Sequence, residues 1–159
     1  MTKSSNKRQT AAVVLAAGQG TRMKSGLPKV LHPLAGRPMI CHLLDSIEKA
    51  GIEKIIVVCP ANHEVTDVIG PYSTVVQSEQ RGTGHAVMQA RTFLEGFDGD
   101  VIVLFGGDPL ITPETLNSIV ERRRADDAPS IVVLAFNSEC PGLYGRLITG
   151  SDGTLESIV

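Results

Sequence analysis

Short apolar runs separated by polar turns recur along the chain. The run K-I-I-V-V-C at Lys54–Cys59 is continuously apolar and rich in β-branched residues, which is typical of a strand buried on both faces of a parallel sheet. Similar runs predict strands at 12–16, 74–76, 100–105 and 130–136. Two more runs, 144–149 and 155–159, flank a Ser-Asp-Gly turn and predict an antiparallel hairpin.

Helices are expected between these strands. A helix is predicted to start at Pro38 and to stop at Gly51, because apolar residues between them return every three or four positions. Further helices are predicted at 84–94, directly after a Gly-Thr-Gly turn, and at 113–124. Strands that alternate with helices predict an α/β fold, a Rossmann-like, mostly parallel sheet with helices on both faces.

Length, composition and charge fit a single globular domain. The chain has 159 residues, of which 42% are hydrophobic, and a formal net charge of −2. We expect a polar N-terminal tail at 1–10 and one domain at 11–159. No apolar run approaches the roughly 18 residues that cross a bilayer, and no signal-peptide pattern is visible, so we expect a cytoplasmic protein without a membrane partner.

Two further classes of partner and site are not expected. The sequence has no Trp and no basic stripe with interleaved aromatic residues, so we expect no nucleic-acid partner. Three cysteines without C-x-x-C spacing predict neither a disulfide framework nor a zinc site.

The segment after the first predicted strand carries the strongest chemical signal. Gly18 and Gly20 allow backbone N–H groups to approach an anion closely, because no Cβ stands in the way. Arg22 and Lys29 can then neutralise a polyphosphate, the first as a fork of donors and the second as a mobile ammonium. Glycine-bearing segments at 18–20, 82–84 and 106–107 all follow strands, so we expect them to meet at one edge of the sheet.

Four motifs, in order, resemble those of the sugar-1-phosphate nucleotidyltransferases. They are L-A-A-G-x-G-T-R-M with L-P-K-V-L, Q-x-E-Q-x-G-T-G-H-A at 77–86, P-L-I at 109–111 and Y-G-R at 144–146. The second is similar to the nucleobase-binding segment of the uridylyltransferase domain in the bifunctional members, which make UDP-N-acetylglucosamine. The resemblance runs from about residue 11 to 159 and implies a nucleotide-diphospho-sugar transferase fold that is incomplete at the C-terminus, without the acetyltransferase β-helix of those members.

This resemblance implies a reaction. A uridylyl group would pass from UTP to N-acetylglucosamine-1-phosphate, giving UDP-N-acetylglucosamine and pyrophosphate for cell-wall or lipopolysaccharide precursors, with Mg²⁺ as cofactor. Because two polyanions must meet, catalysis depends on charge neutralisation and in-line positioning. By resemblance, Arg22 would hold the β- and γ-phosphates, and Lys29 would bridge the α-phosphate and the sugar phosphate.

The other expected binding residues also follow from the resemblance. They are Leu15, Ala16, Ala17 and Gly18 as a backbone cradle, Gln77, Gly82 and Thr83 for uracil, Phe105 and Gly106 after the central strand, and Gly145 for the sugar. The amide of Gln77 can match a base edge because it carries a donor and an acceptor side by side. Gln80 is expected to support the same loop, and His85 is expected to be structural. An ordinary polar surface loop is the alternative interpretation of this segment.

Metal binding is where the sequence departs from the family. Members carry aromatic-Gly-Asp-x-Pro-Leu, whereas this chain has F-G-G-D-P-L at 105–110. If Pro109 sets the register, Gly107 occupies the metal position and Asp108 lies one residue late, so its side chain would point the other way in an extended segment. The backbone at the two adjacent glycines could adjust so that the Asp108 side chain still reaches a metal ion, and Asp108 is therefore the candidate metal ligand.

Three hypotheses stay open. The first is a uridylyltransferase domain from a longer enzyme, since the family's later sugar-binding and metal-binding residues lie beyond Val159 in its order. The second is a protein that binds a nucleotide without turnover. The third is a related transferase for another nucleotide or sugar. A homo-oligomer is also left open.

Overall fold

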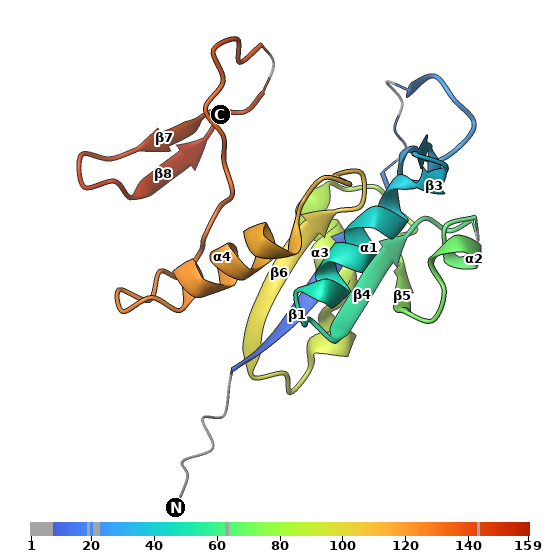
Figure 1. Ribbon diagram of the computed structural model, residues 1–159, viewed down its shortest axis with the longest axis horizontal. Helices are drawn as coiled ribbons and strands as arrows, with labels where there is room; N and C mark the ends of the chain where they lie inside the picture. Colours follow the sequence, from blue (N-terminus) through green and yellow to red (C-terminus); the bar gives the residue numbers. More distant parts are fainter. Residues whose placement is uncertain (1–7, 19, 21–22, 63, 143) are drawn as a thin grey trace, which may run out of the picture.

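A parallel sheet forms the centre of the computed structural model, which describes residues 8–18, 20, 23–62, 64–142 and 144–159. Its four strands lie in the order β5-β4-β1-β6 (Figure 1). They are β1 (Gln9–Leu15), β4 (Lys54–Cys59), β5 (Ser73–Val76) and β6 (Gly99–Phe105). In the middle of the sheet Val13 pairs with Ile56 on one side and with Val103 on the other.

The strand order shows where the chain reverses its direction across the sheet. From β1 it moves outward to β4 and β5, and then it crosses back to β6 on the other side of β1. In open α/β sheets, ligands bind at such a switch point, beyond the carboxyl ends of the strands. The sheet confirms the predicted α/β fold, and it directs attention to the loops after β1 and β6.

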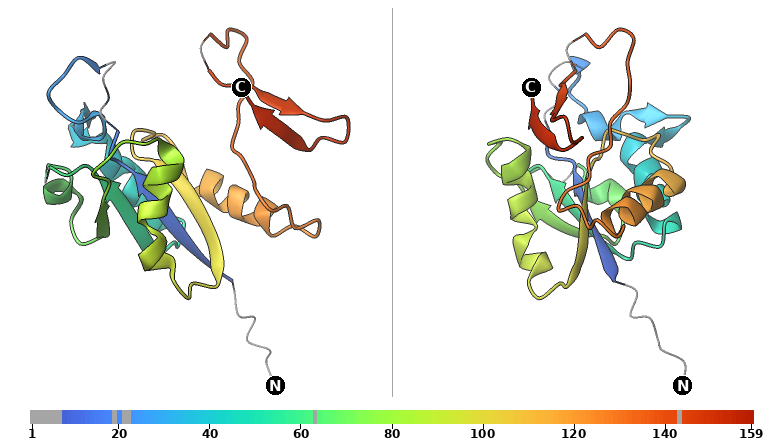
Figure 2. Two further views of the ribbon diagram at one scale, coloured as in Figure 1. Left: turned by 180° about the vertical axis from the view of Figure 1, so that it is seen from behind. Right: turned by 90° about the vertical axis from the view of Figure 1, so that its left-hand side faces the viewer.

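Helices cover both faces of the sheet. The helices α1 (Met39–Lys49) and α4 (Pro113–Arg123) lie on one face, and α3 (Thr83–Gln89) lies on the other (Figure 2). Alternate residues of β1 face these two layers, because Val14 belongs to the core under α1 and Val13 to the core under α3. None of the helices in the described part of the chain is long and apolar enough to cross a membrane.

Several element boundaries differ from the prediction. Pro38 caps α1 instead of forming its first helical residue. The helix predicted at 84–94 is divided, because α3 ends at Gln89 and a 3₁₀ helix, η3 (Arg91–Leu94), follows. The short elements η2 (Lys29–Leu31), α2 (Thr66–Ile69), β2 (Pro33–Leu34) and β3 (Arg37–Pro38) were not predicted. Elements of two to four residues are too short to show a hydrophobic period.

The prediction of a strand at 130–136 is wrong, because these residues do not pair with another strand. The outer edge of β6 is also without a paired strand among the described residues. The predicted hairpin is confirmed, with β7 (Leu147–Thr149) antiparallel to β8 (Leu155–Ile158). It stands apart from the four-stranded sheet in both Figure 1 and Figure 2.

Candidate nucleotide-binding site

The end of β1 offers backbone groups to a ligand. Ala16 donates its backbone N–H to Val58 (2.8 Å), and Leu15 accepts from the backbone N–H of Gly106 (2.9 Å), so the chain stays between its neighbours beyond the strand. The side chains of Leu15, Ala16 and Ala17 are buried, whereas Gly18 is exposed with nothing near the position of a Cβ. Contact with a ligand at Leu15–Gly18 would therefore come from the backbone, as the cradle prediction requires.

Lys29 spans the loops that follow β1 and β6. Its neighbours Val30 and Leu31 are buried and anchor η2, while Lys29 itself is exposed. A Cβ on Gly20 would lie 2.9 Å from the Lys29 Cβ, and a Cβ on Gly107 would lie 2.9 Å from the Lys29 Nζ. Lys29 forms no ion pair within the described residues. Its ammonium therefore lies at the switch point without a carboxylate partner among the described residues.

The loop at 77–83 is tied to the end of β1. Gln77 continues the pairing of β5, because its backbone N–H donates to Cys59 (2.9 Å). The side-chain amide of Gln80 donates to the Ala17 carbonyl oxygen at 2.7 Å, which joins segments 63 residues apart. Thr83 begins α3 after Gly82, whose φ of 95° favours glycine. The predicted cradle and the predicted base-contacting loop therefore lie side by side.

In the loop after β6, Gly106 is packed closely by its neighbours. A Cβ on Gly106 would lie 3.1 Å from Val30 Cγ1 and 3.2 Å from the Leu15 carbonyl oxygen. Phe105 and Asp108 are exposed, and both line a hollow of about 610 Å³ between β6 and 130–134. Within the described part of the chain, no three His, Cys, Asp or Glu side chains gather into a group that could hold a metal. Asp108 therefore belongs to no such group in the described part of the chain.

One predicted residue, Gly145, is not brought to this edge in the described structure. Gly145 lies at the open end of the C-terminal hairpin, where a Cβ would be 3.5 Å from Ile158 and Val159 atoms. Figures 1 and 2 show that hairpin away from the sheet. Arg22 lies outside the described residues and stays a prediction.

The prediction missed the role of Gly107 as the neighbour of Lys29. Gly107 was considered only as the occupant of a metal position. The adjacent pair Gly106 and Gly107 was the available signal, because two glycines after a buried strand indicate a close approach by other groups. Which group approaches is decided by the position of η2, and this depends on the tertiary structure.

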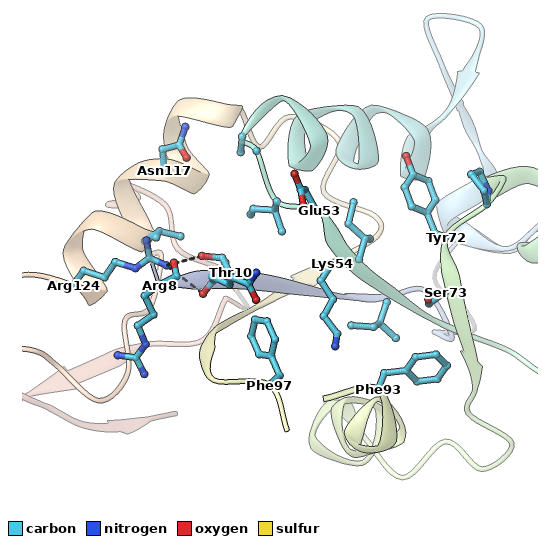
Figure 3. Close-up of a pocket in the computed structure, with 18 residues that line it drawn as sticks. Arg8, Thr10, Glu53, Lys54, Tyr72, Ser73, Phe93, Phe97, Asn117 and Arg124 are labelled. Atoms are coloured by element: carbon cyan, nitrogen blue, oxygen red, sulfur yellow. Dashed lines mark hydrogen bonds between the residues drawn. The ribbon is translucent and has the colours of Figure 1, made fainter. Parts of the chain in front are cut away.

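A second hollow, of about 740 Å³, lies at the opposite end of the sheet, where the strands begin (Figure 3). In the view of Figure 3 the Lys54 ammonium lies between the rings of Phe93 and Phe97, and it is 5.1 Å from the centre of the Phe97 ring. Arg124 donates there to Asp100 (2.7 Å) and to Thr10 (2.9 Å). These contacts stabilise the start of the sheet, and no predicted site residue lines this hollow.

Sequence comparison identifies the family. A profile for the MobA-like NTP transferase domain matches residues 12–151, nearly the whole chain. The chain belongs to this family. The match includes the loops after β1, β5 and β6 that the structure brings to one edge.

Two curated relatives are similar to nearly the whole chain. The bifunctional protein GlmU of Rhodospirillum rubrum is 55% identical over 95% of this chain and 34% of its own length. The bifunctional protein GlmU of Paramagnetospirillum magneticum is 51% identical over 94% of this chain and 33% of its own length. The chain thus spans about a third of the length of the curated relatives that it matches.

Solved structures show the same fold. The crystal structure of Rv0371c from Mycobacterium tuberculosis H37Rv matches with a TM-score of 0.62 and 24% identity, over 72% of this chain and 60% of that one. A manganese complex of Rv0371c matches with a TM-score of 0.58 and 23% identity, over 72% of this chain and 59% of that one. At this identity the likeness supports the α/β fold.

Proposed function

We propose that this domain transfers a uridylyl group from UTP to N-acetylglucosamine-1-phosphate in the cytoplasm, giving UDP-N-acetylglucosamine and pyrophosphate. One observation carries the proposal, namely that three loops meet at the switch point of the sheet. Gln80 joins the loop after β5 to the end of β1, and Lys29 lies across the loop after β6. The similarity to GlmU proteins over nearly the whole chain supports UTP and an amino-sugar phosphate as the substrates.

In this proposal the chain binds and aligns two polyanions. An oxygen of the sugar phosphate forms a bond to the α-phosphorus of UTP, the bond from that phosphorus to the β-phosphate oxygen breaks, and pyrophosphate leaves with the electron pair. The ammonium of Lys29 would neutralise the α-phosphate and the attacking phosphate. Backbone groups at Leu15–Gly18 would hold the nucleotide, and Arg22 remains the predicted partner of the leaving pyrophosphate.

A divalent metal, which we expect to be Mg²⁺, fits the described residues poorly. Asp108 is exposed and belongs to no group of three or more His, Cys, Asp or Glu side chains in the described part of the chain. The Lys29 ammonium lies against Gly107, which occupies the metal position in the register set by Pro109. We therefore assign no step of the reaction to a metal, and Asp108 remains its candidate ligand.

Nucleotide binding tests the central part of the proposal. Titration calorimetry of the 159-residue chain with UTP should show saturable binding. Lys29→Ala should weaken it about tenfold to a hundredfold, because a charge-assisted contact contributes about 1.5–3 kcal/mol. Lys49→Ala, an exposed lysine on the last turn of α1, is the matched control and should leave the affinity unchanged. Equal affinities for the two variants would contradict the role of Lys29.

Binding without turnover is a second candidate function. It is favoured by the lack of a metal-holding group that includes Asp108 among the described residues, and by the position of Gly145 beside the hairpin, which lies apart from the sheet. A pyrophosphate-release assay with UTP and N-acetylglucosamine-1-phosphate separates the two functions. Release by the wild-type chain supports transfer, whereas binding without release supports the second candidate. The variant Gly107→Asp can be accommodated, because the added Cβ meets only the movable end of the Lys29 side chain. It should restore pyrophosphate release only if a missing metal-binding carboxylate is the cause of inactivity.

A transferase for another nucleotide is separated by substrate preference. The same titration with CTP, GTP and dTTP should give weaker binding than UTP if the loop at 77–83 selects uracil. A clear preference for one of the other nucleotides would replace UTP in the proposal while keeping the same site.

A further inference from the structure

Gln77 is buried, yet one of its amide atoms is unpaired. The residue is 5% exposed. Its Nε2 lies 3.3 Å from the Gly82 carbonyl oxygen and 3.1 Å from His85 Nδ1. Because a carbonyl oxygen only accepts, the atom facing Gly82 must be the NH₂ group, and this settles the orientation of the amide. Gln77 Oε1 then has no hydrogen-bond partner among the described residues.

This oxygen is still accessible from outside. The only side-chain polar atom that is both fully buried and unpaired in the described part of the chain is His32 Nε2. Gln77 therefore presents a hydrogen-bond acceptor from an otherwise buried side chain, within the loop that Gln80 ties to the end of β1.

The contact with His85 requires one particular state of the imidazole. Gln77 Nε2 donates, so His85 Nδ1 must carry a lone pair, and the ring proton lies on Nε2. The Gln89 amide nitrogen faces that Nε2 at 3.2 Å and the His85 carbonyl oxygen at 3.1 Å. A neutral imidazole accepts at one nitrogen only. Gln89 is only half-buried and can turn its amide toward water, whereas a turned Gln77 amide would place its oxygen against the Gly82 carbonyl oxygen, so the bond to Gln77 is the one retained.

We propose that His85 selects the nucleobase indirectly, by holding the Gln77 amide so that Oε1 faces the base. The inference rests on the proposed function. Uracil carries N–H at position 3, which can donate to Oε1, whereas cytosine carries a lone pair there. Two lone pairs would then face each other, and a buried acceptor without a donor is costly. His85 is thus a positioning residue, and it discriminates between UTP and CTP without touching either.

The test is the ratio of the dissociation constants for CTP and UTP, measured by titration calorimetry on the 159-residue chain. His85→Ala and His85→Leu both remove the acceptor, and the second keeps more side-chain volume on α3. Each should lower the ratio about tenfold, because only the longer bond to Gly82 still holds the amide. His85→Asn should restore the ratio, since its Oδ1 can accept in place of Nδ1. Gln89→Ala is the matched control and should keep the wild-type ratio.

The possible outcomes separate the inference from the proposed function. A wild-type ratio in a folded His85→Ala or His85→Leu protein overturns the inference and leaves the proposed function standing. A lowered ratio in His85→Asn also overturns it, because a structural defect would then explain all three variants. A wild-type chain that does not bind UTP overturns the proposed function, and the inference falls with it. Circular dichroism checks that each variant is folded.

Discussion

The sheet region, from β1 to α4, and the C-terminal region after it contain similar apolar sequences in very different surroundings. Val57 and Val58 in β4 are fully buried because strands pair on both sides and helices cover both faces. The segment 130–136 also contains β-branched residues, Ile131, Val132 and Val133, but it is unpaired, and every residue of β8 is exposed. The comparison teaches that an apolar, β-prone run becomes a buried strand only where neighbouring strands accept its hydrogen bonds. We therefore expect the stability of this chain to reside in the sheet region.

The same substitution in the two regions should give the largest difference. Leu43→Ala empties a fully buried position on α1 and should lower the free energy of unfolding by about 2–5 kcal/mol. Leu155→Ala removes a side chain that is 43% exposed in β8 and should cost less than about 1 kcal/mol. Urea denaturation followed by circular dichroism measures both. Equal losses would mean that the hairpin is as important to stability as the core.

Two aspartates offer a second, smaller contrast. Asp100 is buried and accepts from Arg124 at 2.7 Å, with Arg8 and Arg123 also near it. Asp100→Ala would leave these guanidinium groups without their shared carboxylate and should cost about 2 kcal/mol, less than a fully buried pair because the arginines are partly solvated.

Asp127 provides the matched control for that contrast. It pairs with Arg122 at 2.6 Å just after α4, where both side chains are exposed. Asp127→Ala should give no measurable change in the denaturation midpoint, because water replaces an exposed ion pair at little cost. A larger effect at Asp127 than at Asp100 would contradict the division between the regions.

The reactivity of the three cysteines should differ between the sheet region and the C-terminal region. Of these contrasts, this one is expected to involve the smallest change in stability. Burial raises the pKa of Cys59 to about 11, and it also raises the pKa of Cys41. With iodoacetamide at about pH 8, the exposed Cys140 should be alkylated first and Cys59 last, because the thiolate is the reactive species. Mass spectrometry over time gives the order. Early modification of Cys59 would show that the sheet opens readily.

The raised pKa of Cys59 also predicts the direction of a pH effect. The unfolded thiol ionises near its ordinary pKa of 9.0, whereas the folded thiol ionises at about 11. Its contribution to stability is therefore complete below about pH 9 and is lost as the pH rises through about 11. Denaturation midpoints at rising pH should fall in that window for the wild-type chain and fall less in Cys59→Ala.

Much of the fold could be predicted because its signals are local. Continuous apolar runs marked β4 and β6, and a helical spacing of apolar residues marked α1. The failure at 130–136 has a non-local cause, because strand pairing depends on a neighbour that a single run of residues does not reveal.

The candidate site divides in the same way. The glycines after β1, β5 and β6 were visible as a pattern, and the parallel sheet brought their segments to one edge as expected. The contact of Lys29 with Gly107 was not predictable, because it depends on how η2 docks against the sheet. The bond from Gln77 to His85 was missed as well, since it depends on the turn at Gly82 and the direction in which α3 leaves it.

The sequence by itself determined the alternation of strands and helices, the positions of the glycine turns and the supply of two cations near the first turn. The tertiary structure alone decided which apolar runs are buried and which side chains meet at the switch point. The physical reason is that periodicity and turn chemistry act over a few residues, whereas hydrogen bonding between strands and side-chain packing join residues far apart in the chain. The bond between Gln80 and Ala17, 63 residues apart, is such a link.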